Sequence, residues 1–128
     1  LKGEITPQGA KNEALQILCA VLLSSEPIII KNVPNIIDVN KLIELLNDLG
    51  VLVTKIDSST YQFEAKDVKL EFMDTDDFKK KASALRGSIM IIGPLLARFG
   101  KARMPKPGGD KIGRRRLDTH FIGLQKLG

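Results

Sequence analysis

The sequence predicts a mixed α/β fold, an α+β arrangement built from β-α-β-α-β-β repeats. Two observations support this fold class. Residues 1–66 alternate short apolar strands with amphipathic helices in that order, and the same order begins again in the second half. The 128 residues are enough for one hydrophobic core, and their 43% hydrophobic and 27% charged content is ordinary for a folded domain.

Apolar spacing and turn residues define the elements of the first unit. Leucines at helical spacing predict a helix over Asn12–Ser24, and a second helix is predicted to start at Asp38, as its N-terminal cap, and to stop at Gly50. The polar stretch Asp57–Thr60 predicts a hairpin between the last two strands. The predicted strands are Leu1–Thr6, Ile28–Ile30, Val51–Ile56 and Tyr61–Ala65.

The second half repeats part of this order. Arg86–Phe99 is predicted to be helical, with Gly93-Pro94 kinking or splitting it, and Lys101–Met104 is a candidate strand. A last helix is predicted from Asp118 to the end of the chain. We therefore assign the first repeat to residues 10–66 and a partial second repeat to residues 82–128.

The second repeat ends at Gly128, where its strand pair is expected to begin. A helix whose apolar face expects a sheet is then left without one. The chain is accordingly predicted to be cut short, and to self-associate so that copies cover each other's apolar surface.

Charge divides the chain into two halves. Residues 1–78 hold 7 Lys/Arg and 13 Asp/Glu, a net −6, whereas residues 79–128 hold 13 Lys/Arg and 2 Asp, a net +11. A cationic half predicts an anionic partner. Nucleic acid is disfavoured, because the basic half has no Trp or Tyr for base stacking, and a small phosphate-bearing ligand is preferred. A non-catalytic polyanion-binding module stays open as the alternative.

Several classes of protein are disfavoured by composition. The longest apolar runs, Ile17–Leu23 and Ile89–Ala97, are too short to span a membrane, and no signal peptide opens the chain, so the cytoplasm is expected. The single Cys19 and the single His120 give no zinc pattern, and neither a metal nor another cofactor is predicted. Cys19 lies in an apolar run, where a buried structural thiol is expected.

The stretch Pro107–His120 is the strongest local indication of chemistry. Paired glycines and Asp110 precede a run of cations, which are Lys111, Arg114, Arg115 and Arg116. Arginine forks suit phosphate and carboxylate oxygens, so the pattern suggests an acid on a loop beside an anion site. Gly108 and Gly113 have P-loop spacing, but Arg114 and Arg115 stand where Lys-Ser/Thr is required. A solvated basic turn is an equally good reading of this segment alone.

Several motifs in order resemble the N-terminal part of the UDP-N-acetylglucosamine enolpyruvyl transferases, over essentially the whole chain. They are Gly-Ala-Lys-Asn (9–12), the run over 20–34 with Ala-Val-Leu-Leu and then Glu-Pro-Ile-Ile-Ile-Lys-Asn-Val-Pro, Leu-Arg-Gly-Ser-Ile (85–89), Gly-Pro-Leu-Leu-Ala-Arg-Phe-Gly (93–100) and Pro-Gly-Gly-Asp-Lys-Ile-Gly-Arg-Arg (107–115). The resemblance implies two inside-out α/β barrels of β-α-β-α-β-β repeats, of which this chain holds one full repeat and part of a second. It also implies transfer of the enolpyruvyl group of phosphoenolpyruvate to the 3-hydroxyl of UDP-N-acetylglucosamine in peptidoglycan synthesis.

The resemblance also implies roles for individual residues. Lys11 and Asn12 match family residues at the phosphoenolpyruvate site, and Arg115 matches an arginine between the two substrates. The UDP-sugar site is implied for Arg86, Arg115, Arg116, Leu117, Asp118 and Thr119. Arg116 stands where a proline is common in the family, and His120 is left between a catalytic and a structural role. Without the motif, Lys11 would be read as a solvent-exposed lysine at a helix start.

Asp110 is the main departure from the family pattern. Many members carry a cysteine on this loop, which acts as the proton donor toward the enolpyruvyl carbon and reacts with the antibiotic fosfomycin. An aspartic acid can donate the same proton when the site closes around it, but it cannot form a thioether with an epoxide. The resemblance therefore implies a fosfomycin-insensitive enzyme with Asp110 as proton donor, and an inactive isolated fragment.

Overall fold

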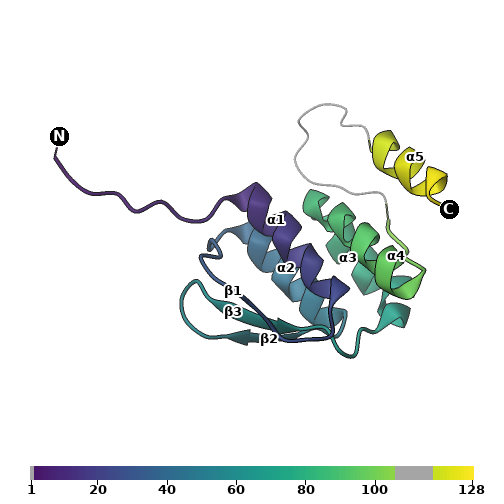
Figure 1. Cartoon of the computed structure of the whole chain (residues 1–128), viewed down its shortest axis with the longest axis horizontal. Coiled ribbons are helices and arrows are strands. Elements are labelled where there is room, and N and C mark those ends of the chain that lie inside the picture. The colour runs from purple at the N-terminus through teal and green to yellow at the C-terminus, as the bar shows by residue number, and fades with distance from the viewer. Residues whose placement is uncertain (1, 106–116) are drawn as a thin grey trace.

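A computed structural model describes residues 2–105 and 117–128 and shows a mixed α/β fold, which confirms the predicted class (Figure 1). The described residues form five α-helices, short 3₁₀-helices and one three-stranded sheet. In chain order these are α1 (Lys11–Ala20), the 3₁₀-helix η1 (Val21–Leu23), β1 (Ile28–Ile30), α2 (Ile37–Asp48), β2 (Leu52–Lys55), β3 (Tyr61–Glu64), η2 (Leu70–Asp74), α3 (Asp76–Ser83), η3 (Arg86–Ile91), α4 (Ile92–Phe99) and α5 (Asp118–Lys126).

The sheet has β3 in the middle, hydrogen-bonded antiparallel to β1 on one side and to β2 on the other. Phe63 on β3 faces Ile28 and Val53 across the two ladders and is fully buried. Helices α1 and α2 lie over one face of this sheet (Figure 1). The predicted hairpin is confirmed, because β2 pairs with β3 and the Asp57 carboxylate accepts the Ser59 N–H at 2.8 Å in the turn.

The core forms where α1 and α2 pack on the sheet and on each other. Because apolar residues recur every three or four positions, each helix turns one apolar stripe inward. The two stripes consist of Leu15, Leu18 and Cys19 on α1 and Val39, Leu42, Leu45 and Leu46 on α2. The helix predicted over Asn12–Ser24 is confirmed, although it starts one residue earlier and its last turn tightens into η1.

The ends of α2 follow the prediction in part. Gly50 stops the helix as predicted, in a left-handed conformation with φ of 94°, which favours glycine. Asp38 does not cap it, however. Ile36 occupies the N-cap position and Asp38 lies in the first turn, where a carboxylate still interacts favourably with the helix dipole.

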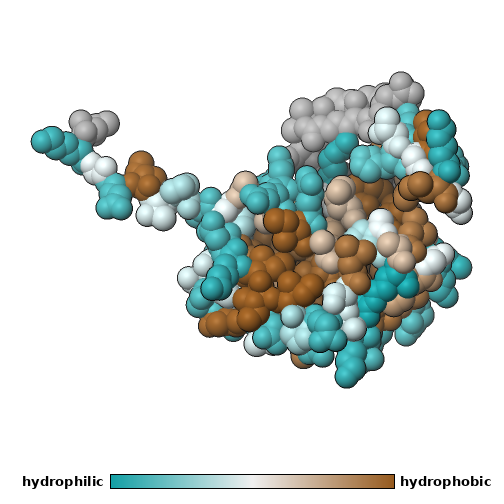
Figure 2. All heavy atoms as spheres, viewed as in Figure 1, coloured by the Kyte–Doolittle hydropathy of each residue, from teal (hydrophilic) through white to brown (hydrophobic). Residues whose placement is uncertain are grey.

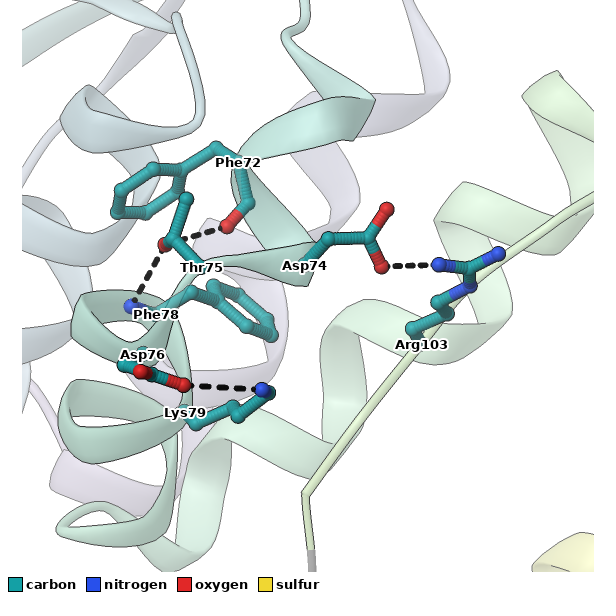
Figure 3. Close-up of polar contacts among 7 residues, drawn as sticks. All are labelled: Phe72, Asp74, Thr75, Asp76, Phe78, Lys79 and Arg103. Carbon is teal, nitrogen blue, oxygen red and sulfur yellow. Dashed lines mark hydrogen bonds and ion pairs between the residues drawn. The ribbon is translucent and has the colours of Figure 1, made fainter.

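Two predicted strands are wrong. Residues 2–10 have no regular secondary structure, and the first of them extend away from the body, with Ile5 91% exposed (Figure 1). Lys101–Met104 also forms no strand. Instead, Gly100 ends α4 in a left-handed conformation and the Arg103 guanidinium pairs with the Asp74 carboxylate of η2 (Figure 3). A strand needs a neighbour to pair with, and the described residues provide none for either segment.

Residues 70–83 form η2 and α3, for which we predicted no element. The Thr75 hydroxyl joins them, because it donates to the Phe72 carbonyl at 2.7 Å and accepts the Phe78 N–H at 3.1 Å (Figure 3). Phe78 is fully buried and meets the Phe72 ring edge-on, with centroids 5.8 Å apart. A threonine followed by two acids is a helix-start signal that the sequence did contain.

The apolar stretch Arg86–Phe99 splits, as predicted, but the break lies between Ile91 and Ile92. Pro94 sits in the first turn of α4, where a missing N–H costs no helical hydrogen bond. Among the described residues, no single helix has the length and apolar composition to cross a membrane. The segments Asp76–Ser83 and Arg86–Phe99 reach that length and composition only when they are taken together, and they are bent by 116° at the break between them.

Candidate functional site

A groove of about 720 Å³ runs between the start of α1 and the start of η3. We call it the α1–η3 groove. The first turns of α2 and α5 complete its walls. Its lining residues are Lys11, Asn12, Leu15, Gln16, Asp38, Lys41, Ala84, Arg86, Gly87, Ile89, Met90, Leu117 and His120.

Four of the sequence-predicted site residues meet in this groove from three distant parts of the chain. Lys11 and Asn12 open α1, Arg86 opens η3, and Leu117 directly precedes α5. Described cationic side chains in the lining outnumber carboxylates, with Lys11, Lys41 and Arg86 against Asp38. A positive, solvent-open concavity of this kind favours an anionic ligand.

The position of Lys11 depends on the turn that precedes α1. Gly9 packs so closely on the loop after β1 that a Cβ there would lie 2.1 Å from the Asn32 carbonyl oxygen. Ala10 is then extended, with φ of −74° and ψ of 132°, and the helix begins at Lys11. Only glycine fits this approach, so Gly9 fixes where α1 starts and where its first side chains point.

A carboxylate from the neighbouring helix holds the Lys11 side chain. The Lys11 ammonium lies 2.7 Å from Asp38 Oδ2, and the two side chains are 41% and 35% exposed. We predicted Asp38 only as a helix cap. Asp38 and Lys41 are three residues apart, and therefore on one face of α2, but nothing in the sequence indicates that this face meets the start of α1.

Arg86 reaches the groove because the turn between α3 and η3 is fixed. The buried Ser88 hydroxyl shares its one O–H between the carbonyls of Ala82, at 2.8 Å, and Leu85, at 2.6 Å. Gly87 lies against the Leu15 side chain of α1. These contacts bring the start of η3 against α1, so Arg86 and Lys11 line the same groove.

The residues predicted at the start of α5 separate into two groups. Leu117 is half-buried and lines the α1–η3 groove with His120, whereas Thr119 lines an apolar pocket of about 380 Å³ between α4 and α5. Asp118 is the first residue of α5, with Leu117 in the cap position, so it is not the N-cap. The predicted site residues Asp110, Arg115 and Arg116 lie outside the described residues.

Cys19 takes no part in this groove. The side chain is buried in the core on α1, and its thiol donates to the Leu15 carbonyl at 3.1 Å. Burial raises the pKa of this thiol to about 12, because the thiolate would lose its hydration. Cys19 is therefore a structural residue, as predicted, and stays protonated and unreactive at neutral pH.

The comparisons with known proteins agree with the motifs. A UDP-N-acetylglucosamine 1-carboxyvinyltransferase of Bacteroides fragilis is 61% identical over all 128 residues, and one of Porphyromonas gingivalis is 55% identical over the same length. A third, from Treponema denticola, is 45% identical over 128 residues. The chain spans about 30% of the length of these curated relatives.

The family comparison covers every residue. Residues 1–128 match the family described as EPSP synthase (3-phosphoshikimate 1-carboxyvinyltransferase). The motifs quoted above are spread over the same range, and the described fold is mixed α/β as the resemblance implied. On this evidence the chain belongs to the EPSP synthase family.

Proposed function

We propose that this chain is part of an enzyme that transfers the enolpyruvyl group of phosphoenolpyruvate to the 3-hydroxyl of UDP-N-acetylglucosamine, in the cytoplasm, for peptidoglycan synthesis. The observation that carries the proposal is the α1–η3 groove, in which Lys11, Asn12, Arg86 and Leu117 come together. The high identity to relatives named for this transfer supports it.

The proposed roles follow from charge and position. Lys11 and Asn12 bind phosphoenolpyruvate at the start of α1, where an ammonium and helix N–H groups favour a phosphate or carboxylate. Arg86 binds the UDP-sugar from the opposite wall of the groove. Leu117, Asp118 and Thr119, with Arg115 and Arg116, extend the UDP-sugar site, and Arg115 also meets phosphoenolpyruvate. Asp110 supplies the proton to the enolpyruvyl carbon.

The architecture we propose for the whole protein is a pair of inside-out α/β barrels. Its first repeat is residues 10–66 and its partial second repeat is residues 82–128. The order α1-β1-α2-β2-β3 supports the first assignment, although the strand expected ahead of α1 is absent from the described residues. A chain covering 30% of its relatives holds only part of such a site, and we expect it to be inactive alone.

An amide NMR titration of the 128-residue chain with UDP-N-acetylglucosamine tests the substrate assignment. Saturable shifts at Arg86 and at Leu117–Thr119 that exceed those caused by UDP and by diphosphate are the expected result. Equal responses to all three anions, weakening steeply with salt, would favour the alternative polyanion-binding module. That alternative rests on the +11 net charge of residues 79–128, which hold 13 Lys/Arg and 2 Asp.

Fosfomycin gives a second test of the chemistry. We define a hybrid in which residues 1–128 replace the matching 30% of the Bacteroides fragilis relative. With Asp110 the hybrid is expected to keep its activity under fosfomycin, and Asp110→Cys is expected to make it lose activity over time, because a thiolate opens the epoxide to a stable thioether, which an aspartic acid cannot form. Cys19 offers no substitute target, because it is buried. Time-dependent inactivation of the Asp110 hybrid would contradict the prediction.

The isolated chain is also proposed to self-associate. Phe121 and Ile122 on α5 and Leu127 directly after it are 44%, 49% and 87% exposed, and apolar surface also gathers over α1 and β1 (Figure 2). Copies that cover these surfaces would remove apolar area from water. Light scattering over a dilution series is expected to show a mass above 14.1 kDa that falls on dilution. A constant monomer mass at every concentration would refute this proposal.

A further inference from the structure

The ammonium of Lys11 and the carboxylate of Asp38 join the starts of two neighbouring helices. Lys11 is the first residue of α1 and Asp38 is the second residue of α2, and Nζ and Oδ2 are 2.7 Å apart. Both helices therefore begin at the same end of the helical layer, and both side chains line the α1–η3 groove.

The first turn of a helix is an unfavourable place for a lysine. Unpaired N–H groups give that end partial positive charge, which repels an ammonium and attracts a carboxylate. Lys11 stands at such an end, whereas Asp38 is placed favourably at the start of its own helix. The Asp38 carboxylate of α2 thus attracts the Lys11 ammonium, whereas the start of α1 repels it.

Stability of the fold does not explain this ion pair. The two side chains are 41% and 35% exposed, and ion pairs so open to water contribute little to folding. Asp38 also places a negative charge in a groove whose other charged lining residues, Lys11, Lys41 and Arg86, are cationic. For an anionic ligand, that charge by itself is unfavourable.

We propose that Asp38 is a positioning residue, which holds the Lys11 ammonium over the α1–η3 groove before an anionic substrate enters. This inference rests on the proposed function, in which Lys11 binds phosphoenolpyruvate, and it says how the Lys11 ammonium is placed. A lysine has four rotatable bonds, so an unheld side chain must be ordered when the ligand binds. An ammonium has three N–H donors, and the donor given to Asp38 fixes the direction of the others.

Two readouts test the proposal, one on the 128-residue chain and one on the hybrid protein. The first is the order of the Lys11 ammonium in the chain by ¹⁵N NMR of lysine Nζ groups, which is expected to fall in Asp38→Ala. The second is the affinity of the hybrid for phosphoenolpyruvate, which is expected to weaken about 3- to 10-fold in Asp38→Ala, because ordering one long side chain is added to the cost of binding. Asp38→Glu is expected to restore both in large part. Electrostatics alone predicts that Asp38→Ala binds phosphoenolpyruvate more tightly, since the loss of the carboxylate makes the groove more positive.

Glu13→Ala is the matched control. Glu13 is also a first-turn acid of a helix, α1, and its loss changes the net charge equally, but it lines a separate small pocket beside Gly9 and Asn32. It is expected to leave Lys11 order unchanged and not to weaken binding, and circular dichroism verifies that each variant is folded. Unchanged Lys11 order in the folded Asp38→Ala chain, or equal or tighter binding by the folded Asp38→Ala hybrid, would overturn the proposal. Loss of Lys11 order with no phosphoenolpyruvate binding by the parent hybrid would support the positioning and count against the proposed function.

Discussion

Lys11→Ala is expected to lower kcat/KM for enolpyruvyl transfer by the hybrid protein about 100- to 1,000-fold, a loss typical of removing one pre-positioned charge or donor at a reacting centre. The ammonium lies in the α1–η3 groove and is held at 2.7 Å by Asp38. Phosphate release measured with both substrates reports the reaction. The hybrid supplies the part of the relative, roughly 70% of its length, that this chain does not cover.

The choice of control lysine makes this result specific. Lys31→Ala removes the same charge from a side chain that lines the pocket beside Gly9, outside the α1–η3 groove, and is expected to stay close to parent activity. Lys11→Arg keeps the charge but not the compact ammonium, and is expected to fall between. If Lys11→Ala kept more than about a tenth of the parent kcat/KM, the assignment of Lys11 to the phosphoenolpyruvate site would be wrong.

The elements that are predicted correctly from the sequence all have a strong local signal. Asn12–Ser24, the second helix with its stop at Gly50, and the hairpin around Asp57–Thr60 depend on periodicity and turn chemistry, which neighbouring residues determine. The strands predicted at Leu1–Thr6 and Lys101–Met104 are wrong because a strand needs a distant partner, which apolar character alone does not specify.

The same distinction between local and distant information applies to the candidate site. The motifs identify Lys11, Asn12, Arg86 and Leu117, which line one groove. They do not identify Asp38 as a contact of Lys11, because that contact exists only where α1 and α2 pack with their starts side by side. The roles of Asp110, Arg115 and Arg116 remain predictions from the motifs, since these residues lie outside the described part of the chain.

Arg98 connects the two halves of the chain through backbone carbonyls. From α4, its Nη1 shares its two N–H groups among the carbonyls of Leu22 and Ser24, each at 3.1 Å, and that of Ala65 at 2.7 Å. The first two follow α1 and the third follows β3. Its guanidinium also lies 4.8 Å from the Phe99 ring centroid. One partly buried cation thus joins α4 to the ends of α1 and of the sheet.

Arg98→Ala is therefore expected to lower the free energy of unfolding by about 3 kcal/mol, because it removes charge-assisted hydrogen bonds and leaves partly buried carbonyls with fewer donors. Urea unfolding of the 128-residue chain, followed by circular dichroism, measures this change. Arg103→Ala is the matched control, since Arg103 is a 73% exposed side chain in an ion pair with Asp74, and its loss is expected to cost at most about 1 kcal/mol. Equal destabilisation by the two variants would show that the carbonyl contacts of Arg98 do not hold α4 to the first unit. A clearly larger loss for Arg98→Ala within a single unfolding transition would support the view that these contacts hold the two halves together as one cooperative structure.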